Sequence, residues 1–228
     1  LAGIHMEGPF IAAAKCGAQD PSRIVPGDPD FFRAVIEAAG GYLRSITFAP
    51  ETANAEELLA VCAEHNIIAS LGHTEADYDT TLGVIAQAKE LGVTVTGTHL
   101  FNAMPAIHHR APGTVAALLT AAKAGDVAVE LIADGVHLVD GTVDMAHSHR
   151  AFAVTDAMAA AGMADGDYEL GSLPVTVSGG VARVESGAIA GGTSTLAQQF
   201  QRFAARHSLG EAVRFTSTTA ADVLGDKD

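Results

Sequence analysis

The chain has no tryptophan, few aromatic residues and only two cysteines. Aromatic residues make up 5% of its 228 residues, and Cys16 and Cys62 form no CxxC pair. Two isolated cysteines do not build a disulfide scaffold, and a chain of this length buries enough apolar surface to be stable without disulfides or a structural metal. We therefore expect one large domain in a reducing cytoplasm, in which any bound metal serves chemistry rather than folding.

Positive charge is also scarce. Lys and Arg number 13 against 27 Asp and Glu, which gives a formal net charge of −14. An acidic chain is poorly suited to bind a phosphate backbone or an anionic membrane surface. No stretch approaches the ~18 uninterrupted apolar residues of a membrane-spanning helix. The composition argues against nucleic acid and membrane as partners and leaves small molecules.

The sequence does contain a repeating cycle of a short apolar run, a polar residue and a helical pattern. The starts of three helices are marked by Asp30, by Asn54 with Glu57 three residues on, and by Pro112. The apolar runs predict strands at residues 2–6, 43–48, 67–71, 93–97, 127–132 and 151–154. This is the α/β pattern of a parallel sheet, with about six βα units.

A chemically reactive side chain follows each predicted strand. In chain order these residues are Glu7, Glu51, His73, His99, His137 and Asp156. In an open doubly wound sheet functional groups gather at one switch point, whereas in a closed (β/α)8 barrel every strand end faces the same mouth. Six such ends favour a TIM-type barrel over the open sheet. Residues 165–185 alternate around a Gly-Gly pair and predict a small β-hairpin insertion.

Three of these residues are candidates for a metal site. Glu7, His73 and His99 lie at strand ends, and the two histidines are 26 residues apart (99 − 73), about one βα unit. One carboxylate and two imidazoles form a catalytic type of divalent site that leaves positions open for water and substrate. The alternative is that each histidine is an ordinary core or helix-capping residue. Zn, Fe, Co and Mn all accept this ligand set, so the identity of the single metal stays open.

Longer sequence motifs surround these residues. They are HMEGPF at 5–10, LGHT at 71–74, THLFNAMP at 98–105, IADGVH at 132–137 and VTDAMAAAG at 154–162. In order and spacing they resemble the N-acetylglucosamine-6-phosphate deacetylases of the amidohydrolase superfamily, over essentially the whole chain. The resemblance implies an amidohydrolase-type barrel and a metal-dependent hydrolase that removes the acetyl group from N-acetyl-D-glucosamine 6-phosphate.

The resemblance also implies a role for each matching residue. Glu7, His73 and His99 look like the metal ligands. Asp156 looks like the catalytic aspartate, and His137 like a second catalytic residue beside the scissile amide. The residues similar to substrate-binding positions are Asn102, Ala103, Arg110, His137, Ala18, Ala190 and Gly191.

Two of these residues have ordinary alternatives, and one implies a partner chain. Asp156 could cap a helix over the alanine-rich run that follows it, and Arg110 could be a solvated loop charge. In relatives this arginine reaches in from the neighbouring subunit, so the resemblance implies a homodimer with Arg110 supplied in trans.

The chain also departs from the family pattern. Complete relatives begin with a β-sandwich and an opening barrel strand, which in some members carries a His-x-His pair for a second metal, and no such pair precedes His5. We therefore expect an incomplete barrel domain over residues 1–228. Two other functions stay open: deacetylation of the galactosamine epimer or another N-acyl sugar, and a non-catalytic remnant that binds sugar phosphate.

Overall fold

The computed structural model describes residues 2–226, so both ends of the expected 1–228 domain lie outside the described residues. The chain divides into two compact units. One comprises Leu1–Cys16 and Pro21–Val129, and the other comprises Gly17–Asp20 and Glu130–Asp228.

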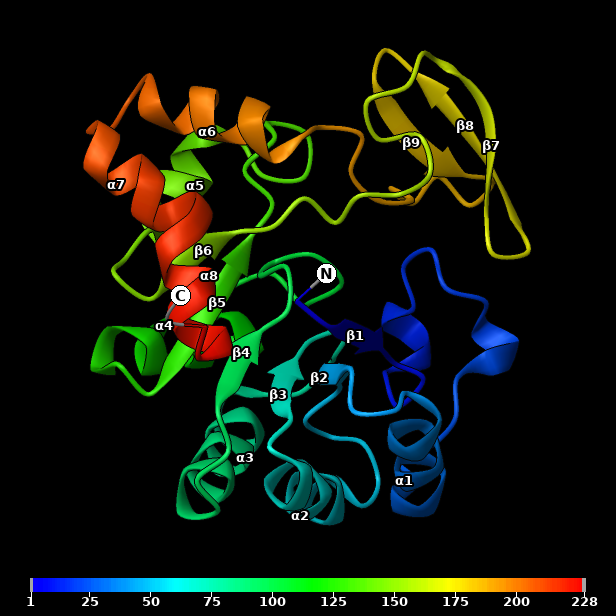
Figure 1. The fold of residues 1–228 in the computed structure, drawn as a ribbon, viewed down its shortest axis with the longest axis vertical. Coiled ribbons are helices and arrows are strands. Elements are labelled where there is room, and N and C mark those ends of the chain that lie inside the picture. The colour runs from blue at the N-terminus through cyan, green and yellow to red at the C-terminus, as the bar shows by residue number, and fades with distance from the viewer. Residues whose placement is uncertain (1, 227–228) are drawn as a thin grey trace. The chain divides into compact units, whose positions relative to one another are not determined.

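Parallel strands form the framework (Figure 1), and they hydrogen-bond in sequence order. They are β1 (Ile4–Glu7), β2 (Leu43–Phe48), β3 (Ile68–Leu71), β4 (Val95–Gly97), β5 (Val127–Leu131) and β6 (Ala151–Ala153). Each predicted strand is present, with ends displaced by at most two residues. The predicted α/β class with a parallel sheet is confirmed, whereas closure into a (β/α)8 barrel stays a prediction.

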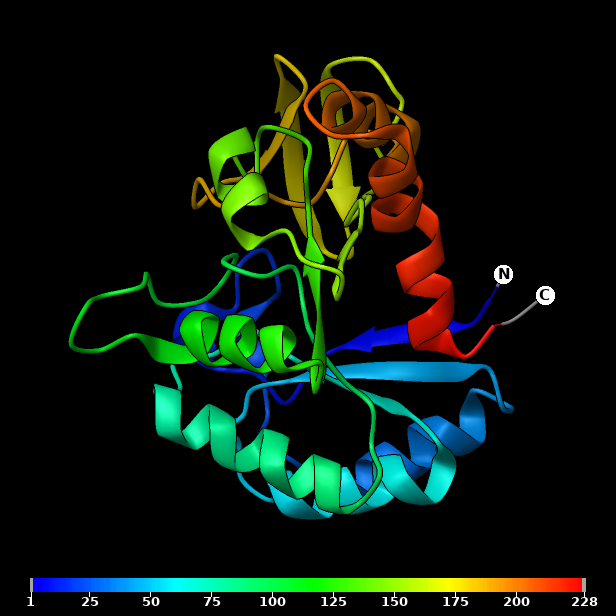
Figure 2. The ribbon, with the colours of Figure 1, turned by 90° about the vertical axis from the view of Figure 1, so that its left-hand side faces the viewer.

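Helices alternate with the strands of the first unit. They are α1 (Pro29–Ala38), α2 (Ala55–His65), α3 (Tyr78–Glu90) and α4 (Gly113–Ala124), with short 3₁₀ turns η1 (Ala13–Lys15) and η2 (Pro21–Arg23). Figure 2 shows α1, α2 and α3 lying along one face of these strands. The side chain of Cys62 is buried in α2.

Two of the three predicted helix starts are wrong in detail. Asp28, not Asp30, caps α1, and its carboxylate accepts hydrogen bonds from two amides at 3.0 Å. Pro29 explains the difference, because proline favours the first helical position and therefore fixes the cap at the residue before it. Asn54 does precede α2, but its side chain donates to the Gly27 carbonyl oxygen at 2.8 Å instead of closing a capping box. Pro112 directly precedes α4, as predicted.

The other face of β1 to β4 carries a chain of side-chain hydrogen bonds. The hydroxyl groups of Thr47 and Thr98 are 2.8 Å apart, that of Thr98 lies 2.6 Å from Ser70, and Thr96 donates to Ser70 at 2.6 Å. Thr47, Ser70 and Thr96 are successive partners in the parallel register. On β1, His5 continues the chain through its Nε2, 2.9 Å from the Thr47 hydroxyl. We call these cross-strand contacts the hydroxyl ladder.

The second unit contains a second, antiparallel sheet. Its strands are β7 (Gly166–Leu170), β8 (Leu173–Ser178) and β9 (Val181–Val184), paired in that order. The predicted hairpin corresponds to β8 and β9, whose turn Gly179-Gly180 has positive φ at both residues. β7 adds a third strand, which the sequence analysis did not separate from the hairpin.

Helices complete this unit. They are α5 (Asp140–Ala146), α6 (Leu196–Ala204), α7 (Leu209–Val213) and α8 (Thr219–Leu224), with one π-helical turn, η3 (Arg214–Thr218), between the last two. Capping boxes formed by Thr195 with Gln198 and by Ser208 with Glu211 start α6 and α7. Both use the Ser/Thr-x-x-Glu/Gln pattern that satisfies amides at a helix start.

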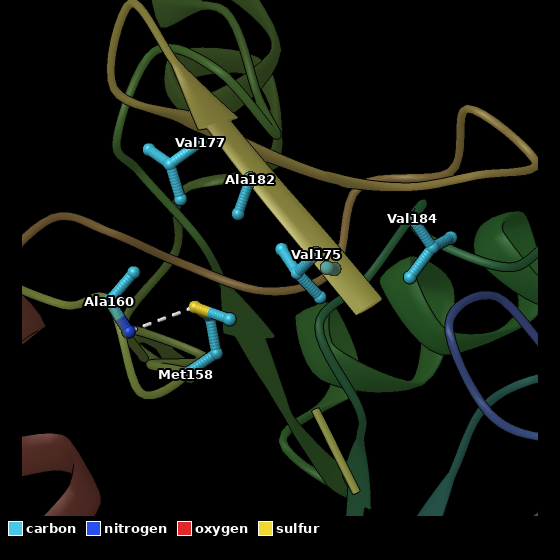
Figure 3. Close-up of a cluster of buried hydrophobic side chains, with 7 residues drawn as sticks. Met158, Ala160, Val175, Val177, Ala182 and Val184 are labelled. Atoms are coloured by element: carbon cyan, nitrogen blue, oxygen red, sulfur yellow. Dashed lines mark hydrogen bonds between the residues drawn. The ribbon is translucent and has the colours of Figure 1, made fainter. Parts of the chain in front are cut away.

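An apolar cluster ties the segment after β6 to the antiparallel sheet (Figure 3). Met158 and Ala160 pack with the inward-facing valines of β8 and β9, and the Ala160 amide donates to the Met158 sulfur at 3.0 Å. The cluster consists of Met158, Ala160, Val175, Val177, Ala182, Val184 and Ala190. Burial of these side chains fixes the course of the chain on either side of Met158.

Candidate metal centre and acid–base group

The first unit brings Glu7, His73 and His99 together at the carboxyl ends of its strands. Glu7 is the last residue of β1, and each histidine lies two residues beyond β3 or β4. The Nε2 atom of His73 is 3.0 Å from Glu7 Oε1 and 3.1 Å from Nε2 of His99, which in turn is 3.5 Å from Glu7 Oε2. The three residues predicted as metal ligands therefore present one ligand atom each to a common point.

This arrangement fits a metal ion. The three ligand atoms lie within 4.8 Å of one another. Among residues 2–226, these side chains are the cluster of His, Cys, Asp or Glu residues that is arranged to hold a metal ion. Ligands at ~2.0–2.1 Å from a tetrahedral ion are about 3.3 Å apart, close to the separations of 3.0–3.5 Å here. Two imidazole nitrogens that face each other beside a carboxylate are a donor set that a divalent cation satisfies at once. These side chains could thus hold one divalent ion.

Contacts behind the ligands orient them. Nδ1 of His73 donates to the backbone oxygen of Lys15 at 2.6 Å, which leaves the lone pair of Nε2 for the metal position. Burial raises the pKa of Glu7, but hydrogen bonds and charge from His73 and His99 outweigh burial, and the net pKa lies well below its ordinary value. Glu7 is therefore the carboxylate anion that a cation requires.

The backbone at these positions is strained. Among residues 2–226, only seven residues other than glycine have positive φ, and four of them are His73 (49°), His99 (27°), Ala103 (52°) and Asp156 (49°). A left-handed conformation costs such residues on the order of 1–3 kcal/mol and persists only where the surroundings hold it. All four were selected from the sequence as site residues, so strain and candidate function coincide.

Glu51 holds the turn that carries His73. Its carboxylate accepts hydrogen bonds from the Thr74 hydroxyl at 2.5 Å and from the Glu75 amide at 2.7 Å. The Ala12 amide donates to the His73 carbonyl oxygen at 2.9 Å from the opposite side. The residue after β2 thus fixes a ligand that follows β3, a role that sequence reasoning did not assign although it noted Glu51 at a strand end.

The predicted substrate residues of the first unit fall in two places. Asn102 and Ala103 form the turn after His99, where the Asn102 side chain donates to the His99 carbonyl oxygen at 3.0 Å and the Ala103 carbonyl accepts from the Thr74 amide at 3.1 Å. Arg110 lies exposed in the loop between β4 and α4, which projects in Figure 2, and its guanidinium contacts His109 Nε2 at 2.7 Å. Asn102 and Ala103 border the candidate metal ligands, whereas Arg110 points to solvent.

The second unit brings His137 and Asp156 together. His137 Nε2 is 3.9 Å from Asp156 Oδ2, and its Nδ1 is 2.7 Å from Oδ2 of Asp134. The side chains of His137 and Asp134 are 5% and 4% exposed, whereas that of Asp156 is 37% exposed. Burial raises the pKa of Asp134, but hydrogen bonds from the His137 ring and from two amides together outweigh burial. The net pKa of Asp134 therefore lies below its usual range.

Asp156 caps no helix, because the residues after it form turns and α6, the next helix described, begins at Leu196. The capping alternative is therefore wrong. Gly191 lies against its backbone: a Cβ there would sit 2.9 Å from the Asp156 carbonyl oxygen. Ala190 is buried in the apolar cluster, and Ala18 packs against that cluster.

Asp134 is the residue that sequence reasoning missed. It stands in the quoted IADGVH word, three residues before His137, a spacing at which a turn can bring an aspartate onto a histidine ring. That spacing was the available signal.

The carboxyl ends of these parallel strands carry a carboxylate and two imidazoles. The chain therefore falls in the class of α/β proteins with a catalytic type of metal site. Comparison with known proteins identifies the relatives within that class. An N-acetylglucosamine-6-phosphate deacetylase of Bacillus subtilis is 36% identical over 99% of the chain and 56% of its own length. A crystal structure of the Mycobacterium smegmatis N-acetyl-D-glucosamine-6-phosphate deacetylase superposes with a TM-score of 0.87 at 39% identity, over 98% of the chain and 60% of that structure.

The chain is therefore homologous to the N-acetylglucosamine-6-phosphate deacetylases and spans somewhat more than half of their length. A related N-acetylgalactosamine-6-phosphate deacetylase of Escherichia coli O157:H7 is 31% identical over 98% of the chain and 58% of its own length. No protein-family model matches the chain. Among the described residues, none of the helices has the length and apolar character needed to cross a membrane.

Replacement of Glu51 tests the contacts that hold His73. Glu51→Ala removes both hydrogen bonds to the turn and is expected to weaken divalent-cation binding by about tenfold or more, as loss of contacts behind a ligand generally does. Binding is measured by competition with a chromophoric chelator. Glu56→Ala, an exposed change in the first turn of α2, is the matched control. Equal affinity in both variants would show that the turn holds His73 without Glu51.

Proposed function

We propose that this chain carries the metal-binding and proton-transfer groups of a deacetylase that converts N-acetyl-D-glucosamine 6-phosphate into D-glucosamine 6-phosphate and acetate. The observation that carries the proposal is the convergence of Glu7, His73 and His99 at the ends of β1, β3 and β4 in a chain homologous to such enzymes. The proposal includes the fold: about six βα units of a (β/α)8 barrel, with strand ends at its mouth.

Amide hydrolysis needs an activated water and a proton for the departing amine. When bound by Glu7, His73 and His99, a divalent cation makes water a competent nucleophile at neutral pH. Asp156 accepts a proton from the attacking water and returns it to the sugar nitrogen, so that the C–N bond breaks with a neutral amine as leaving group. Its partial exposure suits a group that must meet both water and substrate.

His137 contacts the acetyl group. In its protonated form, Nε2–H donates to the acetyl oxygen as negative charge develops there, and the buried Asp134 carboxylate balances the charge of the ring. One donor of this kind is worth roughly 3–4 kcal/mol in favourable cases. Asn102, Ala103, Ala18, Ala190 and Gly191 border the sugar in this proposal.

Arg110 binds the phosphate group. With a net charge of −14, the chain does not attract an anionic substrate at long range, so affinity must come from a local clamp such as a bidentate guanidinium. The exposed guanidinium makes no ion pair with a carboxylate of the described residues. We propose that it acts on the site of a second subunit in a cytoplasmic homodimer.

The galactosamine epimer is the second candidate substrate, favoured by the relative from Escherichia coli O157:H7. The two sugars differ at one hydroxyl, which the metal ligands and Asp156 do not discriminate. Assays on both epimers separate the candidates.

Metal content and acetate release together test the proposed function. The purified protein is expected to contain about one divalent ion per site, to release acetate from N-acetylglucosamine 6-phosphate, and to lose both properties on chelation. Added Zn²⁺, Co²⁺, Mn²⁺ or Fe²⁺ should restore activity. Absence of both metal and acetate would leave the non-catalytic sugar-phosphate-binding protein as the conclusion.

Replacement of Asp156 tests proton transfer. Asp156→Asn preserves shape but removes the base, so kcat is expected to fall about 10²–10⁴-fold while metal content and melting temperature stay unchanged. The control is Asp222→Asn, an exposed change in α8. A near-normal rate in Asp156→Asn would refute this role.

Replacement of Arg110 tests phosphate recognition. A charged hydrogen bond is worth about 1.5–3 kcal/mol, so Arg110→Ala should raise KM for the phosphorylated sugar about 10–100-fold and leave the unphosphorylated sugar nearly unaffected. Lys123→Ala, exposed in α4 of the same unit, controls for loss of positive charge. An equal loss for both sugars would remove the phosphate role.

A further inference from the structure

Asp134 and His137 form a buried pair built by one turn. Oδ1 of Asp134 accepts hydrogen bonds from the amides of Val136 and His137, each at 2.8 Å. Oδ2 is 2.7 Å from Nδ1 of the His137 ring. One carboxylate oxygen therefore closes the turn, and the other accepts a hydrogen bond from the ring.

The turn is held from outside by α6. The Gln199 side chain, fully buried, accepts from the Ala133 amide at 3.0 Å and donates to Ser194 at 3.1 Å. Gly135 has a φ of +83°, a backbone conformation that favours glycine, and a Cβ there would lie 2.4 Å from the Arg202 guanidinium carbon and would displace that group. The carboxylate of Asp134 thus has little freedom to turn away from the ring.

The pair determines which ring nitrogen is available. A carboxylate accepts but cannot donate, so contact with Asp134 keeps a proton on Nδ1 of His137. Nε2 is then the ring atom left to take up the second proton, the one that it donates to the acetyl oxygen in the proposed function, and it faces Asp156 Oδ2 at 3.9 Å. That separation is longer than a hydrogen bond, so Nε2 forms no hydrogen bond with this oxygen of Asp156.

We propose that Asp134 is a positioning residue: it holds the His137 ring proton on Nδ1 and thereby presents Nε2 to the substrate. This inference rests on the proposed function for the identity of the substrate, but the position of the ring proton is a property of the chain itself. Asp134 does not touch the substrate.

A second aspartate–histidine contact in the same unit provides a comparison. Asp144 Oδ1 is 2.8 Å from His207 Nε2, but the Asp144 side chain is 37% exposed and also binds Arg206. That contact lies on the surface formed by α5 and the residues after α6. It should influence the His207 ring and leave His137 unchanged.

The substitution Asp134→Asn tests the proposal. Oδ1 remains an acceptor for the two amides, so the new NH2 group takes the place of Oδ2 and donates toward Nδ1 of His137. The ring proton of the neutral histidine must then move to Nε2, as occurs when the aspartate of a catalytic triad becomes asparagine. Long-range ¹H–¹⁵N spectra of histidine rings in the purified protein measure the tautomer.

The expected result is Nδ1–H in the unchanged protein and Nε2–H in Asp134→Asn. We also expect kcat for acetate release to fall about tenfold or more, because the asparagine amide can neither accept from Nδ1 nor balance the charge of the protonated ring. The matched control Asp144→Asn should alter the signals of His207, and those of the neighbouring His147, and leave His137 unchanged. An unchanged His137 tautomer in Asp134→Asn overturns the proposal. If that variant does not fold, the unchanged protein still decides, because Nε2–H in its neutral His137 ring overturns the proposal equally.

The positioning role and the proposed function fail separately. The tautomer spectra need no substrate, so they judge Asp134 whatever the activity. Absence of acetate release from the unchanged protein overturns the proposed deacetylation alone. A tautomer shift without a lower kcat overturns the claim that presenting Nε2 matters to the reaction.

Discussion

The parallel register of β1 to β4, and the hydroxyl ladder that locks it, is the constraint on which the candidate metal centre depends. Thr47, Ser70 and Thr96 are buried register partners whose hydroxyl groups are joined directly or through Thr98. A buried hydroxyl without a partner costs about 1–3 kcal/mol. Slippage by one residue would turn these hydroxyls to the other face of the sheet and break the ladder. The strand ends therefore stay level, which places Glu7, His73 and His99 within reach of one point.

Two of the candidate site histidines are held by partners that perform no chemistry in the proposed function. His73 relies on the Lys15 carbonyl oxygen and on the turn fixed by Glu51, and His137 relies on Asp134. These contacts offset the cost of left-handed backbone at His73. In a site organised in this way the side chains are oriented during folding, so they need not reorganise during the reaction.

The two units hold chemically distinct groups. In the first, a carboxylate with two imidazoles suits a divalent cation, and in the second, a partly exposed aspartate lies near a buried aspartate–histidine pair. This division matches the two needs of amide hydrolysis in the proposed function, a nucleophile and a proton carrier. The acidic composition is compatible with the proposed function, because the recognition of a small phosphorylated sugar proposed there depends on a few local contacts.

The strands were predictable from the amino-acid sequence, because fully buried parallel strands are continuous apolar runs, and so were the reactive residues that follow them. The sequence motifs also selected the three candidate metal ligands, His137 and Asp156, but not Asp134. Only tertiary structure decided the cap at Asp28, the third strand β7, and the supporting roles of Glu51, Asp134 and Lys15. The physical reason is distance along the chain, because periodicity and capping preferences act over only a few residues. A carboxylate after β2 holds a turn after β3, and a backbone carbonyl orients a histidine ring 58 residues away. Such contacts depend on the folded geometry.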